Sequence, residues 1–384
     1  MNKRRSVPHV LCLSRHCKIH IYEGLTELLG LLRMKGFELE ILSAGDSVAE
    51  PAKWQPDGVS YRVVRPSRSK FGIPTLARLL ASAILSSFRI RPAIVLGCDC
   101  WGNILAALLC RLTGSRHLYY GLELPFEKRP HMSLIARLEH WSVRRADLVV
   151  TMDGHHVDFI CEQTGASRNR CVFLPVAASG PVNLEKSDVL RSSLGLAQGD
   201  VLLLQAGAVG AAQQSLELAE AARLWPHHWH LVLHTHSPAD SNPYFQALLQ
   251  AVGHIENVHV HNQPVARDQL DSLIRSTDIG IAWYDRGLLG FRAELLGLAA
   301  GKIGRCLRNG IPVIVPNLST IREYIEEYQC GVCVNDLTEI PRAAESILRD
   351  YERFRANALR CYEQLWRPER YFPEIQQRVS EWFP

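Results

Sequence analysis

The chain has 384 residues, 47% of them hydrophobic and 21% charged, which is typical of a packed globular protein with two or three domains. Its 43 Lys and Arg against 39 Asp and Glu leave a formal charge of +4, an excess too small to indicate nucleic-acid binding. We expect no membrane-spanning helix, because Arg78 and several serines interrupt the longest apolar stretch, residues 76–88.

The predicted elements of the first half alternate between short apolar runs and amphipathic stretches. Alternating or continuous apolar patterns predict strands, whereas apolar spacings of three and four residues predict helices. The predicted strands cover residues 9–14, 37–43, 59–64, 93–96, 117–120, 147–151 and 171–175. The predicted helices cover residues 22–35, 75–88, 102–112, 133–145 and 155–164. This alternation predicts a parallel sheet with helices on both faces.

The same pattern restarts after a polar stretch at residues 179–199. The second half has predicted strands at residues 201–205, 230–234, 258–261, 279–283, 312–315 and 331–334. Its predicted helices cover residues 214–224, 245–252, 267–276, 302–308, 320–328 and 340–363. A further amphipathic segment, residues 369–383, closes the chain.

We therefore expect an α/β protein with two Rossmann-like, doubly wound domains that face each other across a cleft. The first domain would cover residues 1–178 and the second residues 200–365, with a linker at 179–199. Residues 366–384 would form a C-terminal helix that packs back towards the first domain. Ligands of such folds bind beyond the carboxyl ends of the strands, so functional residues are sought in the loops that follow strands.

The cysteines predict buried, reduced thiols of a cytosolic protein. Their number, eleven, is odd, and several lie inside apolar, strand-like runs. Two closer pairs, Cys98 with Cys100 and Cys330 with Cys333, have strand-like flanks and no histidine pair to complete a zinc knuckle. We therefore predict that these thiols pack in the core and that the chain has no metal site.

The order of four motifs in the second half is the most specific signal in the sequence. They read Thr277-Asp278-Ile279, then Gly301-Lys302-Ile303, then Gly310-Ile311-Pro312-Val313-Ile314, and finally Gly331-Val332-Cys333-Val334. This order resembles the donor-binding half of glycosyltransferases with the GT-B fold, in the retaining group that includes sucrose-synthase-like and mannosyltransferase-like enzymes. The first half resembles the same group in a glutamate after a strand, Glu123, and in the strand that begins Ala146-Asp147-Leu148.

The resemblance implies a retaining hexosyltransferase that moves a sugar from a nucleotide-sugar donor to an unknown acceptor. Enzymes of this kind act in the synthesis of glycans, polysaccharides or glycolipids. The nucleotide sugar is a substrate, and the resemblance implies neither a cofactor nor a metal ion.

The residues themselves favour a diphosphate site at Gly301 and Lys302. A helix N-terminus has unpaired N–H groups and a partial positive charge, and both stabilise a leaving diphosphate. Gly301 would let the phosphates approach the backbone, and Lys302 would add a point charge. Gly207, after the strand at 201–205, is the second candidate for a backbone contact. The alternatives are a solvated surface lysine at 302 and an ordinary turn glycine at 207.

Three departures from the family pattern bear on the donor site. Arg305 stands where the family has the glutamate that is taken as the ribose ligand, and the loop at residues 207–214 has no cation. The glycine-rich loop after the first strand is replaced by residues 14–18. Arg305 could supply the positive charge that the 207–214 loop lacks.

Glu123 and His16 are the candidate catalytic residues of the first domain. Glu123 directly follows a predicted strand, where a carboxylate could orient an acceptor hydroxyl group. The alternative for Glu123 is a helix cap or a salt bridge. His16 follows the first strand and is expected to line the pocket. Other histidines, including His230 and His234, are taken as surface or loop residues.

Two alternative functions remain open from the sequence. One is a sugar-nucleotide epimerase or hydrolase on the same fold, because a fold does not fix a function. Its acids would be Glu123, Glu127, Asp285 and Glu294, which are not clustered in the sequence. The other is a catalytically inactive homologue that serves as a partner subunit. This alternative rests on Arg305, on the absence of a cation from the loop at residues 207–214 and on the loss of the glycine-rich loop after the first strand.

A run of basic residues in the first half predicts contact with a membrane surface or an anionic acceptor. No acidic residue lies between Asp57 and Asp99, a stretch that holds Arg62, Arg65, Arg68, Lys70, Arg78, Arg89 and Arg91. Apolar residues at helical spacing within it give one apolar face, which could meet either lipid or the sheet. We expect a cytoplasmic protein with a peripheral contact at the inner face of an anionic membrane.

Overall fold

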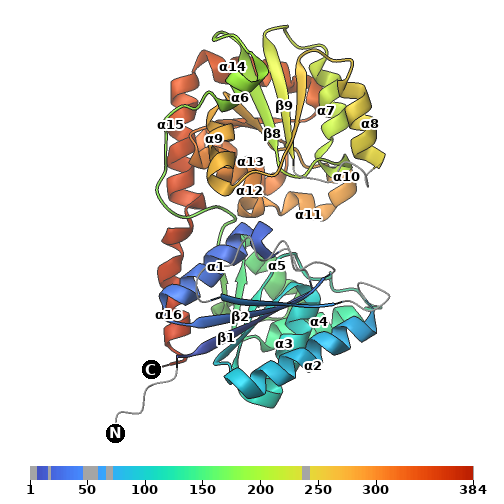
Figure 1. The fold of residues 1–384 in the computed structure, drawn as a ribbon, viewed down its shortest axis with the longest axis vertical. Coiled ribbons are helices and arrows are strands. Elements are labelled where there is room, and N and C mark those ends of the chain that lie inside the picture. Colours follow the sequence, from blue (N-terminus) through green and yellow to red (C-terminus); the bar gives the residue numbers. More distant parts are fainter. Residues whose placement is uncertain (1–6, 16–18, 46–58, 66–71, 236–242, 384) are drawn as a thin grey trace. The chain divides into compact units, whose positions relative to one another are not determined.

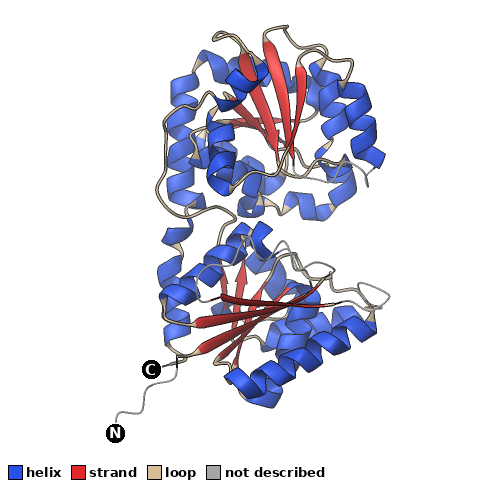
Figure 2. Ribbon diagram, viewed as in Figure 1, coloured by secondary structure: helices blue, strands red, loops and turns tan. Residues whose placement is uncertain are grey.

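The computed structural model describes residues 7–15, 19–45, 59–65, 72–235 and 243–383. The chain divides into two compact units. Unit 1 consists of Met1–Ser179 and Pro368–Pro384, and unit 2 consists of Gly180–Arg367. Each unit is a parallel sheet with helices on both faces (Figures 1 and 2), which confirms the predicted α/β class.

Unit 1 is a doubly wound sheet in which every strand pairing is parallel. Its strands, in order across the sheet, are β3 (Val59–Val64), β2 (Glu38–Ala44), β1 (His9–Ser14), β4 (Ile94–Cys98), β5 (Arg116–Tyr120), β6 (Leu148–Thr151) and β7 (Cys171–Phe173). Its helices are α1 (Glu23–Met34), α2 (Ile73–Ile90), α3 (Asp99–Thr113), α4 (Leu134–Arg145), α5 (Gly154–Thr164) and α16 (Phe372–Ser380). The order reverses direction between β1 and β4, the point at which such sheets bind ligands.

Strand β1 shows why the buried strands appear as continuous apolar runs in the sequence. Val10 and Cys12 belong to the core on one face of the sheet, whereas Leu11 and Leu13 belong to the core on the other. All four side chains are completely buried, as expected for a parallel strand covered on both sides. Helix α16 adds Phe372 to the first of these two cores.

Helix α2 packs on the sheet with the apolar face that the sequence placed at helical spacing. Leu79 and Ala83 are fully buried there, so this face is core and not a lipid-facing surface. By length and composition, however, α2 meets the requirements of a membrane-spanning helix, which corrects the expectation that no segment would. Buried core helices of globular proteins meet the same requirements.

Unit 2 repeats the architecture with the strand order of a dinucleotide-binding fold. Across the sheet, its strands are β10 (Val258–Asn262), β9 (Trp229–Thr235), β8 (Val201–Ala206), β11 (Ile279–Ile281), β12 (Val313–Pro316) and β13 (Gly331–Val334). Its helices are α6 (Val189–Leu194), α7 (Ser215–Ala222), α8 (Pro243–Val252), α9 (Arg267–Arg275), α10 (Arg286–Leu289), α11 (Phe291–Glu294), α12 (Gly301–Arg308), α13 (Ser319–Tyr328), α14 (Ile340–Arg349) and α15 (Tyr351–Cys361). The strand order reverses between β8 and β11.

Two segments differ from the expected elements. Residues 179–199, expected to be a linker, contain α6, whose Arg191 is buried and pairs with Asp278 at 2.5 Å. The expected helix at 340–363 ends at Arg349 and restarts at Tyr351, because Asp350 leaves the helical conformation.

The cysteines are consistent with the expected packing role. Every cysteine that the structure describes is a free thiol. Cys98 lies 3.6 Å from Cys12 across the buried sheet, and burial raises the pKa of the Cys98 thiol. The Cys98 thiol is therefore protonated and inert at neutral pH.

Candidate functional site

The carboxyl edge of the unit 2 sheet joins the loop after β8 to the start of α12. Gly207 directly follows β8 and has a φ of +109°, a conformation that side chains rarely adopt. A Cβ atom at Gly207 would lie 3.2 Å from Cε of Lys302, so the lysine side chain lies against the bare backbone. Lys302 Nζ donates a hydrogen bond of 3.1 Å to the carbonyl oxygen of Ala208. Two predicted binding residues, Gly207 and Lys302, are thus in contact.

The core holds α12 in this position. Gly280 of β11 faces Cys306, and Gly304 faces the ring of Trp366 so closely that a Cβ atom would collide with it. Ile303 and Leu307 are completely buried on the same helix. Because α12 is fixed on three sides, the direction of the Lys302 side chain follows from the packing of unit 2.

Two cations follow each other by one turn on α12. Burial lowers the pKa of Lys302 to about 8, and burial lowers the pKa of Arg305 to about 10. Among the described residues, no carboxylate forms an ion pair with Lys302, whose Nζ instead donates to a backbone carbonyl and lies 5.9 Å from the centre of the Tyr284 ring. A half-buried ammonium group without a carboxylate is destabilised, and a bound anion would reverse this. The site is therefore suited to an anion.

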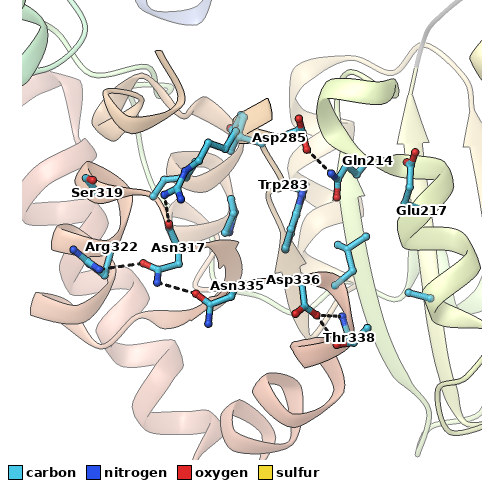
Figure 3. A pocket seen from close by; sticks show the side chains of 16 residues that line it. Gln214, Glu217, Trp283, Asp285, Asn317, Ser319, Arg322, Asn335, Asp336 and Thr338 are labelled. Carbon is cyan, nitrogen blue, oxygen red and sulfur yellow. Dashed lines mark hydrogen bonds between the residues drawn. The ribbon is translucent and has the colours of Figure 1, made fainter. Parts of the chain in front are cut away.

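A cavity of about 870 Å³ opens at the same edge of the sheet (Figure 3). Tyr284, which contacts Lys302, also lines this cavity. The other polar or charged lining side chains come from the start of α7 and from the segments after β11, β12 and β13: Gln214, Glu217, Asp285, Arg286, Asn317, Ser319, Arg322, Asn335, Asp336 and Thr338. Such a lining offers many hydrogen-bonding groups, which suits a polar ligand such as a sugar or a nucleoside.

Hydrogen bonds within this lining fix its shape. Asn317 Nδ2 donates to Asn335 Oδ1 at 3.0 Å, and Arg322 donates to Asn317 Oδ1 at 3.3 Å (Figure 3). Gln214 donates to Asp285, which joins the start of α7 to the segment after β11. These residues follow strand ends, but the sequence analysis did not single out Asn317, Asn335 or Gln214.

Two acids that the sequence analysis weighed for an epimerase act as helix caps. Asp285 Oδ1 accepts a hydrogen bond of 2.7 Å from the backbone N–H of Leu288 at the start of α10. Glu294 Oε2 accepts hydrogen bonds from the backbone N–H and the hydroxyl of Ser319, at the start of α13. Burial alone would raise the pKa of Glu294, but the hydrogen bonds from Ser319 and the charge of Arg286 lower it overall. Both acids thus have structural partners.

Unit 1 places one of the two catalytic candidates, Glu123, at the carboxyl edge of its own sheet. Glu123 is exposed and lies in the loop after β5. His16 lies outside the described residues. Asp99, which the sequence marks only as the end of a stretch without acidic residues, has a φ of +58° and accepts hydrogen bonds from the Ser14 hydroxyl and the Arg15 backbone N–H. Asp99 thereby fixes the start of the loop that follows β1.

The structure brings the four predicted binding residues together in unit 2, whereas the catalytic candidate Glu123 lies in the other unit. Gly207, Gly301, Lys302 and Arg305 all lie at or near the start of α12 in unit 2. Lys302 has its charged group on the loop that lacks a cation of its own. Glu123 belongs to unit 1.

Comparisons with known proteins define the class of this fold and site. A family model described as a glycosyl transferase 4-like domain matches residues 23–177, and one described as the C-terminal domain of glucosyltransferase 3-like proteins matches residues 246–371. No curated protein gives a significant sequence match.

Solved structures share the fold over nearly the whole chain. The Anabaena protein Alr3699/HepE in complex with UDP-glucose is 14% identical, with 97% of this chain and 99% of that chain covered and a TM-score of 0.73. Sucrose-phosphate synthase from Thermosynechococcus elongatus is 13% identical, with 98% and 99% covered and a TM-score of 0.71. WaaG, a glycosyltransferase involved in lipopolysaccharide biosynthesis, is 14% identical, with 97% and 99% covered and a TM-score of 0.67.

Two doubly wound units of this strand order, together with the two family models, define a glycosyltransferase of the GT-B fold. The two family models match most of the chain between them, and the chain belongs to the group 1 glycosyltransferases. The resemblance seen in the sequence motifs is thereby confirmed.

Proposed function

We propose that the chain is a retaining hexosyltransferase whose nucleoside diphosphate sugar binds at the carboxyl edge of the unit 2 sheet. The observation that carries the proposal is the amino group of Lys302, which lies on the loop after β8 and has no carboxylate partner among the described residues. The diphosphate would lie beside Lys302 and Gly207. Because Gly207 has no side chain, the phosphates could approach the backbone at the end of β8 closely. The polar cavity next to Tyr284 would take the sugar or the nucleoside.

The chemistry needs positive charge at the bond that breaks. When the sugar leaves, negative charge develops on the diphosphate, and cations already in place stabilise it more than they stabilise the ground state. Lys302 and Arg305 would supply this charge together with the first N–H groups of α12, without a metal ion. Glu123 of unit 1 would orient the acceptor hydroxyl group.

A binding screen followed by a transfer assay tests the proposal. Because Alr3699/HepE was solved with UDP-glucose, UDP and UDP-glucose come first in a panel that also contains guanosine and adenosine diphosphates. We expect one nucleoside diphosphate to raise the melting temperature, by a stabilisation of about 2.7 kcal/mol at 100 times its Kd. No stabilisation by any member of the panel would contradict the donor site.

The retaining mechanism has a separate readout. The anomeric configuration of the sugar first transferred or released, followed by proton NMR, should equal that of the donor. An inverted first product would leave the donor site intact but remove the retaining mechanism. Binding without any turnover, over a range of glycan and lipid acceptors, would instead support an inactive partner subunit.

We further propose that unit 1 contacts an anionic membrane at the inner face, through the outer side of α2 and the end of α3. Phe88 is 79% exposed and Leu112 is 72% exposed, and both line one cavity of about 800 Å³. Arg91 and Arg116 line the same cavity, so apolar side chains and cations occur together. Anionic lipid attracts such a surface, by about 1 kcal/mol for each well-placed cation.

Not all the basic residues counted in the sequence are available for this contact. Arg62 and Arg89 both bind the buried carboxylate of Glu40, and these two cations fix α2 on the sheet. Burial alone would raise the pKa of Glu40, but hydrogen bonds from Ser86, Arg62 and Arg89 lower it overall. Arg65 and Arg78 are exposed and remain candidates. Arg68 and Lys70 lie outside the described residues.

A further inference from the structure

Strands β9 and β10 carry two pairs of histidines on one face at the edge of the unit 2 sheet. The two strands are parallel, and their register places His261 beside His234. Asn257, the residue before β10, accepts a backbone hydrogen bond from Leu231, so His259 lies two residues further along β10 than the position beside His230. Leu231 and Leu233, at the alternate positions of β9, belong to the core on the opposite face. Because side chains alternate along a strand, the histidines share the face that this core does not use.

The first pair brings two ring nitrogens to metal-chelating distance. His230 Nδ1 and His259 Nε2 are 3.1 Å apart, and the two rings are stacked with an angle of 28° between their planes. A zinc–nitrogen bond is about 2.0–2.1 Å long, so one ion can contact both nitrogens at an angle near 100°. Both side chains are half-buried, so solvent reaches the pair.

We propose that His230 Nδ1 and His259 Nε2 bind one divalent transition-metal ion of the zinc, nickel and copper class. Imidazole nitrogen is the ligand that these ions prefer among the groups at this edge. Within the residues that the structure describes, no group of three or more His, Cys, Asp and Glu side chains is placed to hold a metal ion, so water would complete the coordination by the two histidines.

Asp200 places a negative charge behind the pair. Its Oδ2 accepts a hydrogen bond of 2.7 Å from the backbone N–H of Ala197 and lies 3.7 Å from His230 Nε2, the ring nitrogen that does not face His259. A negative charge at this distance favours the His230 tautomer that has its proton on Nε2 and its lone pair on Nδ1. His259 Nε2 then donates to His230 Nδ1 when the pair is empty. When the metal binds, this proton moves through solvent to His259 Nδ1 and the ring stays neutral.

Burial lowers the pKa of both rings and so favours their neutral forms. Burial lowers the pKa of His230, opposed by Asp200 and assisted by Arg191 and His228. Burial also lowers the pKa of His259, assisted by His230. Of the groups that act on His230, Arg191 carries a permanent positive charge, and this charge is balanced by Asp278 at 2.5 Å. Neutral imidazoles retain the lone pairs that a metal ion requires.

The second pair is less suited to an ion. His234 and His261 face each other through Nδ1 atoms 2.9 Å apart, but His234 is only 3% exposed. An ion at that pair would lose most of its water. The first pair is therefore the site that we assign.

A bound ion would clamp an edge strand. β10 lies at the end of the sheet and is held on one side by β9 alone. The pair lies near the amino end of β9, whereas Lys302 and Gly207 lie at the carboxyl edge of the same sheet. The site is thus structural and separate from the donor site, and it requires no catalytic activity for its test.

Calorimetry with nickel or zinc chloride near pH 7.5 tests the site. We compare wild type with His259→Asn, and with the matched control His254→Asn, an exposed histidine in the loop before β10. Wild type and the control should bind the same number of ions, and His259→Asn should bind one fewer. Asp200→Asn should keep the stoichiometry but weaken that ion's affinity by roughly 10- to 100-fold.

Circular dichroism and the melting temperature without metal show whether the variants remain folded. If His259→Asn is unfolded, His259→Gln replaces it, with the same expectations. Equal stoichiometry and affinity in wild type and the position 259 variant would overturn the proposal. A loss of the same ion in the position 254 control would also overturn it, because it would place the ion elsewhere.

Discussion

Lys302 Nζ and the carbonyl oxygen of Ala208 are joined by a hydrogen bond of 3.1 Å, although the two residues lie 94 positions apart in the chain. The contact is possible because the neighbouring residue, Gly207, has no side chain between the lysine and the end of β8. In the sequence, Gly207 after β8 and Lys302 in the first turn of α12 are two separate candidates for diphosphate binding. In the folded protein they form one cationic site at the reversal point of the sheet.

Replacing Lys302 by alanine should weaken the binding of the nucleoside diphosphate while leaving the fold intact. A hydrogen bond to a charged group contributes about 1.5–3 kcal/mol, which corresponds to a Kd raised roughly 10- to 100-fold. Calorimetry measures this change. Arg223→Ala, which removes an exposed cation elsewhere in unit 2, is the control and should bind like wild type. An unchanged Kd in Lys302→Ala would remove the lysine from the site.

The affinity for the diphosphate should fall as the pH rises above about 8. Burial places the pKa of Lys302 at about 8 in the free protein, and a bound anion raises this pKa because it favours the charged form. Below this pKa the lysine is already charged, so the affinity is greatest there. Above it, binding must take up a proton, and the Kd rises by up to about tenfold per pH unit.

The phosphates do not titrate in this range, because their last pKa is about 6. The measurement is calorimetry between about pH 7 and pH 9.5, with the Lys302→Ala variant in parallel. The pH dependence should vanish in that variant. A wild-type Kd that stays constant across the range would show that the lysine charge does not take part in binding.

Replacing Arg305 by glutamate should also weaken diphosphate binding. Arg305 lies one turn after Lys302 on α12, so a carboxylate at 305 would repel the diphosphate and pair with the lysine. We expect a Kd raised at least about tenfold, with Arg305→Gln between this variant and wild type. Tighter binding by Arg305→Glu would mean that the position serves as a ribose ligand, as its place in the family pattern suggests.

The sequence predicted the elements whose signals are local. Strands β1 and β3 begin and end where their patterns do, because β1 is buried and apolar along its length and β3 alternates apolar with polar side chains. Helices α10 and α11 were missed, because four residues contain no period of 3.6. The first of them is held instead by the side chain of Asp285, which caps its N-terminus.

The donor site could be predicted only in part for a similar reason. The Gly-Lys pair at 301 and 302 is visible because it opens a helix after a recognisable motif. The contact with Gly207, the cavity at Tyr284 and the histidine pair depend on which strands are neighbours and in what register. That information lies in the pairing of distant segments, and a pattern along one segment does not contain it.

The membrane contact of unit 1 should require the exposed apolar side chains at the ends of α2 and α3. We expect wild type to sediment with vesicles that contain anionic lipid, to stay in the supernatant with neutral vesicles and to dissociate in high salt.

Replacing Phe88 and Leu112 by serine should abolish sedimentation, because these two side chains would enter the interface. Replacing Arg91 by serine should weaken it. Leu224→Ser, which removes an even more exposed leucine from unit 2, is the control and should sediment like wild type. If wild type remains in the supernatant with both kinds of vesicle, the proposed membrane contact is wrong. Sedimentation of Phe88→Ser/Leu112→Ser at the wild-type level would place the contact on another surface.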